Sequence, residues 1–182
     1  MPFKKKYGIS GNSQTIVFRT SRLRRLCRNF AQKLKMTRIQ LKRVSGNFGF
    51  EARDASGHTI RMDSNPESGG NNFGVRPMQT LLMALGGCSG IDIVSILNKQ
   101  RQTVDDFHMT IEGDREKGKE PSLWENVHIR FDLEGAIYPE KAIKACELSM
   151  AKYCSVAATL RESGCTITWE VYVNNTFAYT TK

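Results

Sequence analysis

Apolar residues outnumber polar ones on nearly every helical face of one stretch, from Pro77 to Leu97. Pro77 suits the first turn of a helix, where a missing backbone N–H costs nothing. A helix that is apolar all round must be buried. The pattern therefore predicts a central core helix around which the rest of the chain is organised.

The middle of this predicted helix consists of small residues: Gly86, Gly87, Cys88, Ser89 and Gly90. Three glycines in five positions cost roughly 1 kcal/mol each against Ala, so something should offset that loss. Small side chains let another backbone approach closely, with Cys88 as the only soft nucleophile at the contact. A tight helix crossing around a buried, inert Cys fits equally well, and the helix pattern leaves both interpretations open.

Alternating apolar and polar positions predict strands on both sides of the helix. Residues 39–62 predict an antiparallel meander with a turn at 54–57. Residues 107–111 and 127–133 predict two half-buried strands of one hairpin, and residues 165–173 form the clearest single strand.

The pattern defines two further segments less clearly, a second helix and a loop. A second helix is predicted from Pro139, its pattern shifts around 152–155, and the sequence leaves open whether a new helix begins at Ser155. A loop rich in Gly and Asn, residues 64–75, could be a mobile cover over a site or a plain connector.

The formal charge of +9 belongs to the start of the chain. Residues 1–35 contain ten of the 27 Lys and Arg residues and no acid, which leaves 17 basic against 18 acidic side chains elsewhere. Such a start is typical of a dispensable extension upstream of Met36, a targeting segment, or an arm for nucleic acid or a membrane surface. The near-neutral remainder gives nucleic-acid binding no support, and we expect no stretch long and uncharged enough to span a membrane.

At 182 residues the chain fits one domain with an appendage. We expect a basic, flexible or dispensable extension over 1–35, a single domain over 36–176, and a C-terminal tail over 177–182.

The five cysteines are odd in number, widely spaced and without a secretory signal, so reduced thiols in a cytoplasmic setting are the default. Their strand and helix positions place Cys146 and Cys165 in the core. A core position does not explain Cys88 and Cys154. A Cys near the start of a helix lies at the positive end of the helix dipole, which favours the thiolate form. The hairpin histidines lie on its polar side without a neighbouring Cys, and we expect no metal site.

Three motifs follow one another along the chain: SGH-x-I-x-MD at 56–63, RPMQTLLMALGGCSGIDIVSIL at 76–97 and KYCSVA at 152–157. Their order resembles the OsmC/Ohr family of thiol-dependent hydroperoxide reductases, and the resemblance covers roughly residues 36–175. With its pattern GGCSxxD, the sequence is similar to a less characterised OsmC-like branch of the family. The resemblance implies an α+β fold whose antiparallel sheets wrap around a long buried cysteine-bearing helix, in an intertwined homodimer with residues of both chains around each site.

The resemblance also implies a chemistry. Cys88 would attack the peroxide O–O bond as thiolate, and Cys154 would condense with the sulfenic acid into an intrasubunit disulfide. No bound cofactor is implied; an external dithiol of lipoyl type, such as a lipoylated protein, would reset the pair. An apolar pocket beside the thiol would favour organic peroxides. The alternative is a non-catalytic dimer of the same fold that binds a hydrophobic ligand or senses redox state.

A buried thiol needs a positive neighbour to ionise at neutral pH, because burial alone raises a Cys pKa. Peroxidatic family members supply an Arg from the N-terminal sheet, oriented by a Glu near the start of the cysteine helix. The resemblance places Arg53 near that position, with Arg76 as the other candidate.

The family's glutamate is missing from this sequence. The matching positions hold Met78 or Gln79, so the Arg–Glu clamp cannot form in the same way. Asp92, four residues after Cys88 and therefore on the same helix face, could substitute, although a carboxylate close to a thiol opposes its ionisation.

Overall fold

The computed structural model describes residues 36–181, and residues from Gln40 onward form one compact unit. The predicted basic extension over 1–35 and Cys27 lie outside the described residues.

The first sheet is the predicted antiparallel meander of three strands. The strand register places Leu41, Phe50 and Ile60 on one apolar face of the sheet. All three side chains are exposed to solvent in the single chain. The sheet thus has an apolar face that the described residues leave open to solvent. Its strands are β1 (Gln40–Ser45), β2 (Gly49–Arg53) and β3 (Thr59–Met62).

The loop over 64–75 closes around one buried carboxylate, that of Asp63. Both of its oxygens accept backbone N–H groups, at 3.0 Å or less, from Phe73, Asn71 and Ser64. These bonds, that of Phe73 above all, hold the pKa of Asp63 below its usual value. Because the carboxylate ties both ends of the loop, the connector interpretation describes it better than a mobile cover. The loop contains one 3-10 turn, η1 (Pro66–Ser68).

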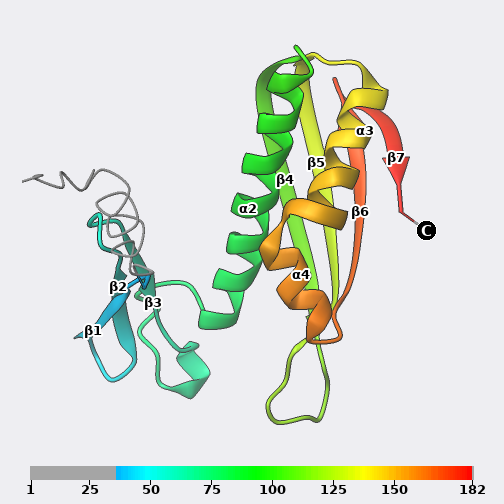
Figure 1. The fold of residues 1–182 in the computed structure, drawn as a ribbon. Helices are drawn as coiled ribbons and strands as arrows, with labels where there is room; N and C mark the ends of the chain where they lie inside the picture. Colours follow the sequence, from blue (N-terminus) through cyan, green and yellow to red (C-terminus); the bar gives the residue numbers. More distant parts are fainter. Residues whose placement is uncertain (1–35, 182) are drawn as a thin grey trace, which may run out of the picture. The chain divides into compact units, whose positions relative to one another are not determined.

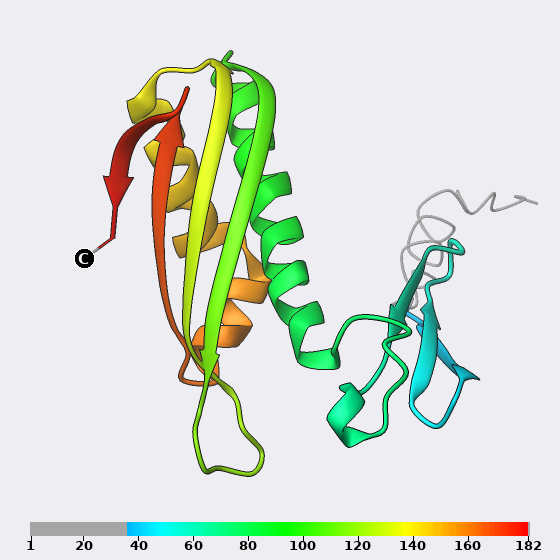
Figure 2. The ribbon, with the colours of Figure 1, turned by 180° about the vertical axis from the view of Figure 1, so that it is seen from behind.

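A four-stranded sheet carries the α-helices of the described residues, α2, α3 and α4, on one face (Figures 1 and 2). The predicted hairpin is confirmed as two long antiparallel strands, β4 (Thr103–Arg115) and β5 (Trp124–Ala136). The expectation of purely antiparallel sheets is wrong for one pair, because β5 and β6 run parallel. The helices between them form the crossover that a parallel pair requires. The remaining elements are α2 (Pro77–Lys99), α3 (Pro139–Leu148), α4 (Ser155–Glu162), β6 (Thr166–Val173) and β7 (Thr176–Thr180).

The prediction of a C-terminal tail over 177–182 is wrong, because most of these residues belong to β7, which pairs antiparallel with β6. The turn between the two strands is made by Asn174 and Asn175, both with positive φ, of 49° and 62°. Asn tolerates the left-handed region, and two such residues in sequence are typical of a tight hairpin turn. This turn signal was present in the sequence.

Helix α2 is buried on one side only. Leu85, Ile93 and Leu97 are fully buried in the core, whereas Met83 and Ile91 are 54% and 74% exposed. The predicted burial on every side is therefore not achieved within a single chain. The helix is also long and apolar enough to cross a membrane by length and composition, which corrects the expectation that no stretch would be. A core helix can have the same length and composition, so this property does not distinguish a helix buried in a protein core from one that crosses a membrane.

Candidate functional site

The thiols of Cys88 and Cys154 are neighbours in the folded chain. Cys88 lies in α2 and is half-buried, whereas Cys154 stands at the start of α4 and is only 3% exposed. Cys88 lies close enough to Cys154 to raise its pKa, and both are free thiols. The packing of α4 against α2 thus brings together the two cysteines that the sequence singled out.

A single π-helical turn, η2 (Ser149–Tyr153), separates α3 from α4 and places Cys154. The turn is closed by the Cys154 N–H, which donates to the Ser149 carbonyl at 2.9 Å. Cys154 then adopts an extended backbone, and its sulfur accepts the Ala157 N–H at 3.4 Å. A new helix therefore begins at Ser155, with Cys154 as its N-cap residue, which answers the question that the sequence left open.

The helix start does not make Cys154 a thiolate. Burial raises the pKa of Cys154 to about 11, the Ala157 N–H lowers it, and the neighbouring Cys88 raises it again. Desolvation thus outweighs the helix-start effect expected from the sequence. At neutral pH Cys154 therefore keeps its proton.

The other two described cysteines belong to the core, as predicted. Cys146 is fully buried in α3, and burial raises its pKa far above the usual value. Burial also raises the pKa of Cys165, against a smaller opposing effect of the Arg161 charge. Such thiols are inert at neutral pH.

Asp92 bonds to the connection between α3 and α4. Its Oδ2 accepts the hydroxyl of Ser149 at 3.1 Å, and Ser149 is completely buried. The same hydroxyl lies 3.4 Å from the Ser89 carbonyl. Sequence reasoning missed Ser149, although a lone Ser three residues after Cys146, on the apolar side of the predicted helix, was an available signal.

The candidate arginines form no hydrogen bond with Cys88 in the described part of the chain. Arg53 is exposed at the end of β2. Arg76 is the N-cap residue of α2, and its guanidinium donates to the Gly74 carbonyl at 3.1 Å. Gln79, one of the positions matching the missing glutamate, accepts the Arg76 backbone N–H at 3.0 Å and so caps the helix.

An apolar hollow of about 720 Å³ follows α2 and β4, and a second of about 520 Å³ adjoins it. Cys88 does not line either hollow, so the apolar pocket expected beside the thiol lies on a neighbouring face of the helix instead. The lining shared by both consists of Gly86, Gly87 and Met109.

The glycines of α2 make room for side chains of β4. A Cβ added at Gly86 would lie 2.9 Å from the Ile111 side chain, and one at Gly90 would lie 2.9 Å from that of Met109. A Cβ at Gly87 would meet nothing within 4 Å. The close approach of another backbone, expected from the sequence, therefore does not occur at these glycines within the described residues.

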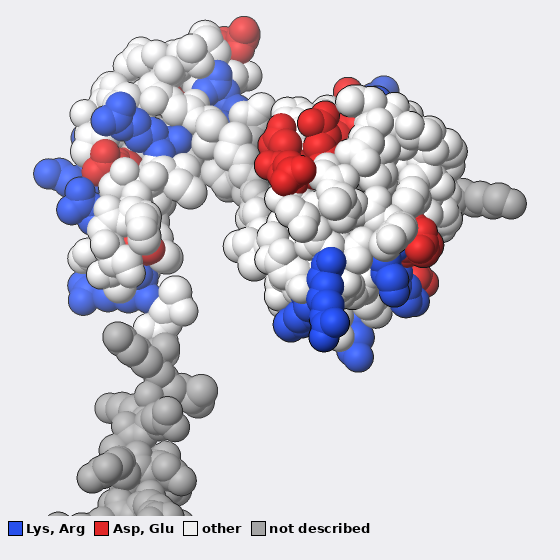
Figure 3. Space-filling model, turned by 90° about the horizontal axis from the view of Figure 1, so that it is seen from above, with Lys and Arg blue, Asp and Glu red and all other residues white. Residues whose placement is uncertain are grey.

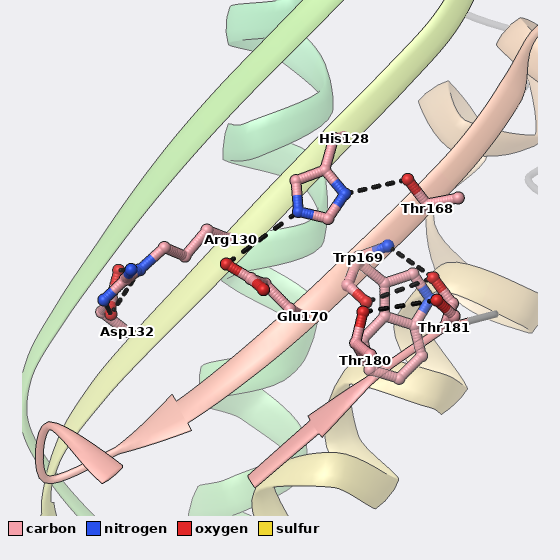
Figure 4. Close-up of polar contacts among 8 residues, drawn as sticks. All are labelled: His128, Arg130, Asp132, Thr168, Trp169, Glu170, Thr180 and Thr181. Atoms are coloured by element: carbon pink, nitrogen blue, oxygen red, sulfur yellow. Dashed lines mark hydrogen bonds and ion pairs between the residues drawn. The ribbon is translucent and has the colours of Figure 1, made fainter. Parts of the chain in front are cut away.

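The opposite face of the sheet carries the predicted polar side of the hairpin (Figure 4). There His128 bonds Thr168 at 2.9 Å and lies 4.0 Å from Glu170, while Arg130 pairs with Asp132 at 2.8 Å. These side chains bond to one another across the strands. Among residues 36–181, no three His, Cys, Asp or Glu side chains group as a metal site would require.

Charged side chains do not merge into one basic surface on the face drawn in Figure 3. The described residues there show small, separate groups of both signs with uncharged surface between them. The nucleic-acid role considered for residues 1–35 concerns a segment outside the described residues and stays a prediction.

The fold and the paired thiols define an α+β protein with a dithiol between two helices. The chain matches the family model described as OsmC-like protein over residues 69–170, a range that includes both cysteines. It is 40% identical over 115 residues to Protein YhfA of Escherichia coli K12, covering 63% of this chain and 82% of that protein. The chain therefore belongs to the OsmC-like protein family.

Solved structures agree with this assignment. A hypothetical protein from Aquifex aeolicus is 30% identical, with a TM-score of 0.64 over 77% of this chain and 98% of that chain. An organic hydroperoxide resistance protein OsmC from Legionella pneumophila is 18% identical, with a TM-score of 0.59 over 77% and 98% of the two chains. One from Elizabethkingia anophelis is 13% identical, with a TM-score of 0.60 over 79% and 99%. The predicted OsmC-like fold is thereby confirmed.

Proposed function

We propose that this protein reduces organic hydroperoxides, with Cys88 and Cys154 as its catalytic dithiol. The observation that carries the proposal is the adjacency of a half-buried thiol on α2 and a second thiol at the start of α4. Membership of the OsmC-like family supports a role in peroxide or stress response. Two proteins that share the fold are named organic hydroperoxide resistance proteins.

The proposed reaction has three steps. The Cys88 thiolate attacks the hydroxyl oxygen of the peroxide, the O–O bond breaks, and Cys88 becomes a sulfenic acid, while the alkoxide takes a proton from solvent and leaves as the alcohol. The sulfur of Cys154 then attacks the Cys88 sulfur, the S–O bond breaks, and a disulfide forms with release of water. Cys154 holds its proton at neutral pH and so supplies the one that the departing hydroxyl needs. An external dithiol of lipoyl type reduces the disulfide by two exchange steps and is itself oxidised to a disulfide.

A second copy of the chain would complete the site. The hollow along α2 and β4 and the open apolar face of the first sheet are surfaces that a homodimer would bury. A thiolate on Cys88 needs a positive neighbour, and we assign Arg53 to that role across the dimer. The four described cysteines are free, which suits the reducing cytoplasm that we propose as its location.

The test is peroxide turnover by the purified full-length chain with cumene hydroperoxide and dihydrolipoamide. We expect steady consumption of peroxide and a Cys88–Cys154 disulfide in the peptide map. Cys88→Ser should abolish consumption, and Cys154→Ser should stop at the sulfenic acid. Cys165→Ser, which changes a buried core thiol, is the matched control and should retain turnover. Oxidation of Cys88 no faster than that of a free cysteine would contradict the proposal.

The second candidate is a non-catalytic dimer that binds a hydrophobic ligand or senses redox state. The apolar hollow, which Cys88 does not line, favours it. This candidate predicts no turnover and, for a redox sensor, a single stoichiometric oxidation. The same assay therefore separates the two functions.

A further inference from the structure

A continuous set of contacts leads from α2 to the backbone of Cys154. The Asp92 carboxylate accepts the Ser149 hydroxyl at 3.1 Å, and the Ser149 carbonyl accepts the Cys154 N–H at 2.9 Å. Asp92 follows Cys88 by one helical turn, so both ends of this path lie beside the two thiols. One serine thus connects the helix that carries the first thiol to the turn that carries the second.

The Ser149 hydroxyl is well placed for such a role. It has a single proton to donate, and its shorter contact is to Asp92, 3.1 Å against 3.4 Å for the Ser89 carbonyl. Ser149 is 0% exposed, so water cannot replace Asp92 as its partner without a rearrangement of the core. The bond also spans two helical segments that are 57 residues apart in the chain.

The connection acts on η2, which is one π-helical turn. Such turns are frequent at functional sites. The direction in which Cys154 leaves this turn determines whether its sulfur can reach Cys88. A disulfide tolerates only a narrow range of Cα separations and side-chain directions.

We propose that Asp92, acting through Ser149, is a positioning residue that holds Cys154 within bonding reach of the oxidised Cys88. The inference rests on the proposed function, because it concerns the step in which the Cys88 sulfenic acid and the Cys154 thiol form a disulfide and release water. The positioning role concerns this closing step and not the first step, in which the organic hydroperoxide oxidises Cys88.

The test is a single-turnover experiment on the reduced full-length chain with one equivalent of cumene hydroperoxide. Samples are quenched at intervals, dimedone traps the sulfenic acid, and intact mass measures the sulfenic acid and disulfide forms. Asp92→Ala and Ser149→Ala should each slow disulfide closure by about tenfold or more, because a misplaced reacting group loses effective concentration. In Ser149→Ala, which leaves the charge beside Cys88 unchanged, the rate of Cys88 oxidation should stay within about twofold of wild type, so that the trapped sulfenic acid accumulates.

Two further variants separate positioning from a general loss of structure. Asp92→Asn keeps an oxygen that accepts the Ser149 hydroxyl and should restore closure close to the wild-type rate. Asp114→Asn removes an exposed carboxylate on β4 and is the matched control for charge. The double variant Asp92→Ala/Ser149→Ala should close no more slowly than either single variant, since both remove the same bond.

The outcomes distinguish failure of this inference from failure of the proposed function. The positioning role would be overturned if Asp92→Ala formed the disulfide at the wild-type rate. It would also be overturned if the double variant slowed disulfide formation by the product of the two single effects. Wild type that forms neither sulfenic acid nor disulfide would overturn the peroxidase proposal instead. In that case, equilibration of the protein with reduced and oxidised glutathione tests the positioning role, because it measures the effective concentration of Cys154 at Cys88. Asp92→Ala should lower this effective concentration by about tenfold, and an unchanged value would contradict the role.

Discussion

The sulfur of Cys154 accepts a hydrogen bond from the backbone N–H of Ala157 at 3.4 Å. A residue proposed to do chemistry is therefore also the N-cap of α4. Sulfur is a weak acceptor, and this cap is correspondingly easy to replace.

Replacing Cys154 by Ala should destabilise the chain more than replacing it by Ser. Ala leaves the Ala157 N–H without its cap, which costs about 1 kcal/mol, whereas a Ser hydroxyl is a preferred N-cap acceptor. Urea unfolding of the reduced full-length variants measures the difference. Equal losses in both variants would show that packing of the sulfur, and not the cap, stabilises this helix start.

The raised pKa of Cys154, about 11, predicts slow alkylation at neutral pH. Its rate with iodoacetamide should keep rising up to about pH 11, whereas an ordinary thiol levels off soon after about pH 8.5. Timed alkylation followed by peptide mass mapping gives the rate for this residue alone. A plateau already at pH 9 would mean that the site does not desolvate the thiol.

The same pKa shift predicts how stability depends on pH. A thiol whose pKa is higher in the folded than in the unfolded state stabilises the fold while protonated. Its contribution is complete below about pH 8.5 and is lost as the pH rises toward about 11. Thermal unfolding from pH 7 to 11 should show this decline, and Cys154→Ser should make it shallower. Cys146 and Cys165, whose pKa values are also raised, should account for part of what remains.

Asp63 should control the order of the loop over 64–75. Because its pKa is lowered in the fold, its stabilising effect is present above about pH 3.9 and is lost as the pH falls through the lower folded value. In Asp63→Ala, hydrogen exchange of this loop should accelerate at neutral pH, since Asn71 and Phe73 lose their acceptor. Asp54→Ala, which breaks a similar turn at His58, is the control and should leave the loop protected.

Ile91 tests the proposed homodimer. It is the most exposed apolar side chain of α2 and lines the larger hollow. Ile91→Glu should lower the solution mass from that of a dimer to the 20.5 kDa of one chain, because a charge would be buried without a partner. Sedimentation equilibrium measures the mass, and Tyr138→Glu, at an exposed aromatic residue before α3, is the control. A wild-type chain that is already monomeric would contradict the dimer directly.

Local patterns predicted the elements of the fold where they were regular. The alternation over 107–111 and 127–133 became β4 and β5, and the apolar stretch from Pro77 became α2. The parallel pairing of β5 with β6 was missed, because alternation gives the faces of a strand and not its neighbour. The strand β7 was missed because the Asn174–Asn175 turn was not recognised.

The sequence by itself determined which two cysteines a core position does not explain, because strand and helix periodicity follow from local spacing. It also determined the class of fold, through an order of motifs that resembles the OsmC/Ohr family. Only the tertiary structure decided that Cys88 and Cys154 are neighbours and that burial outweighs the helix start at Cys154. It alone decided that Asp92 bonds Ser149, and that neither candidate arginine forms a hydrogen bond with Cys88 in the described part of one chain. Desolvation and contacts between distant segments arise only when helices pack, and no pattern along the chain contains them.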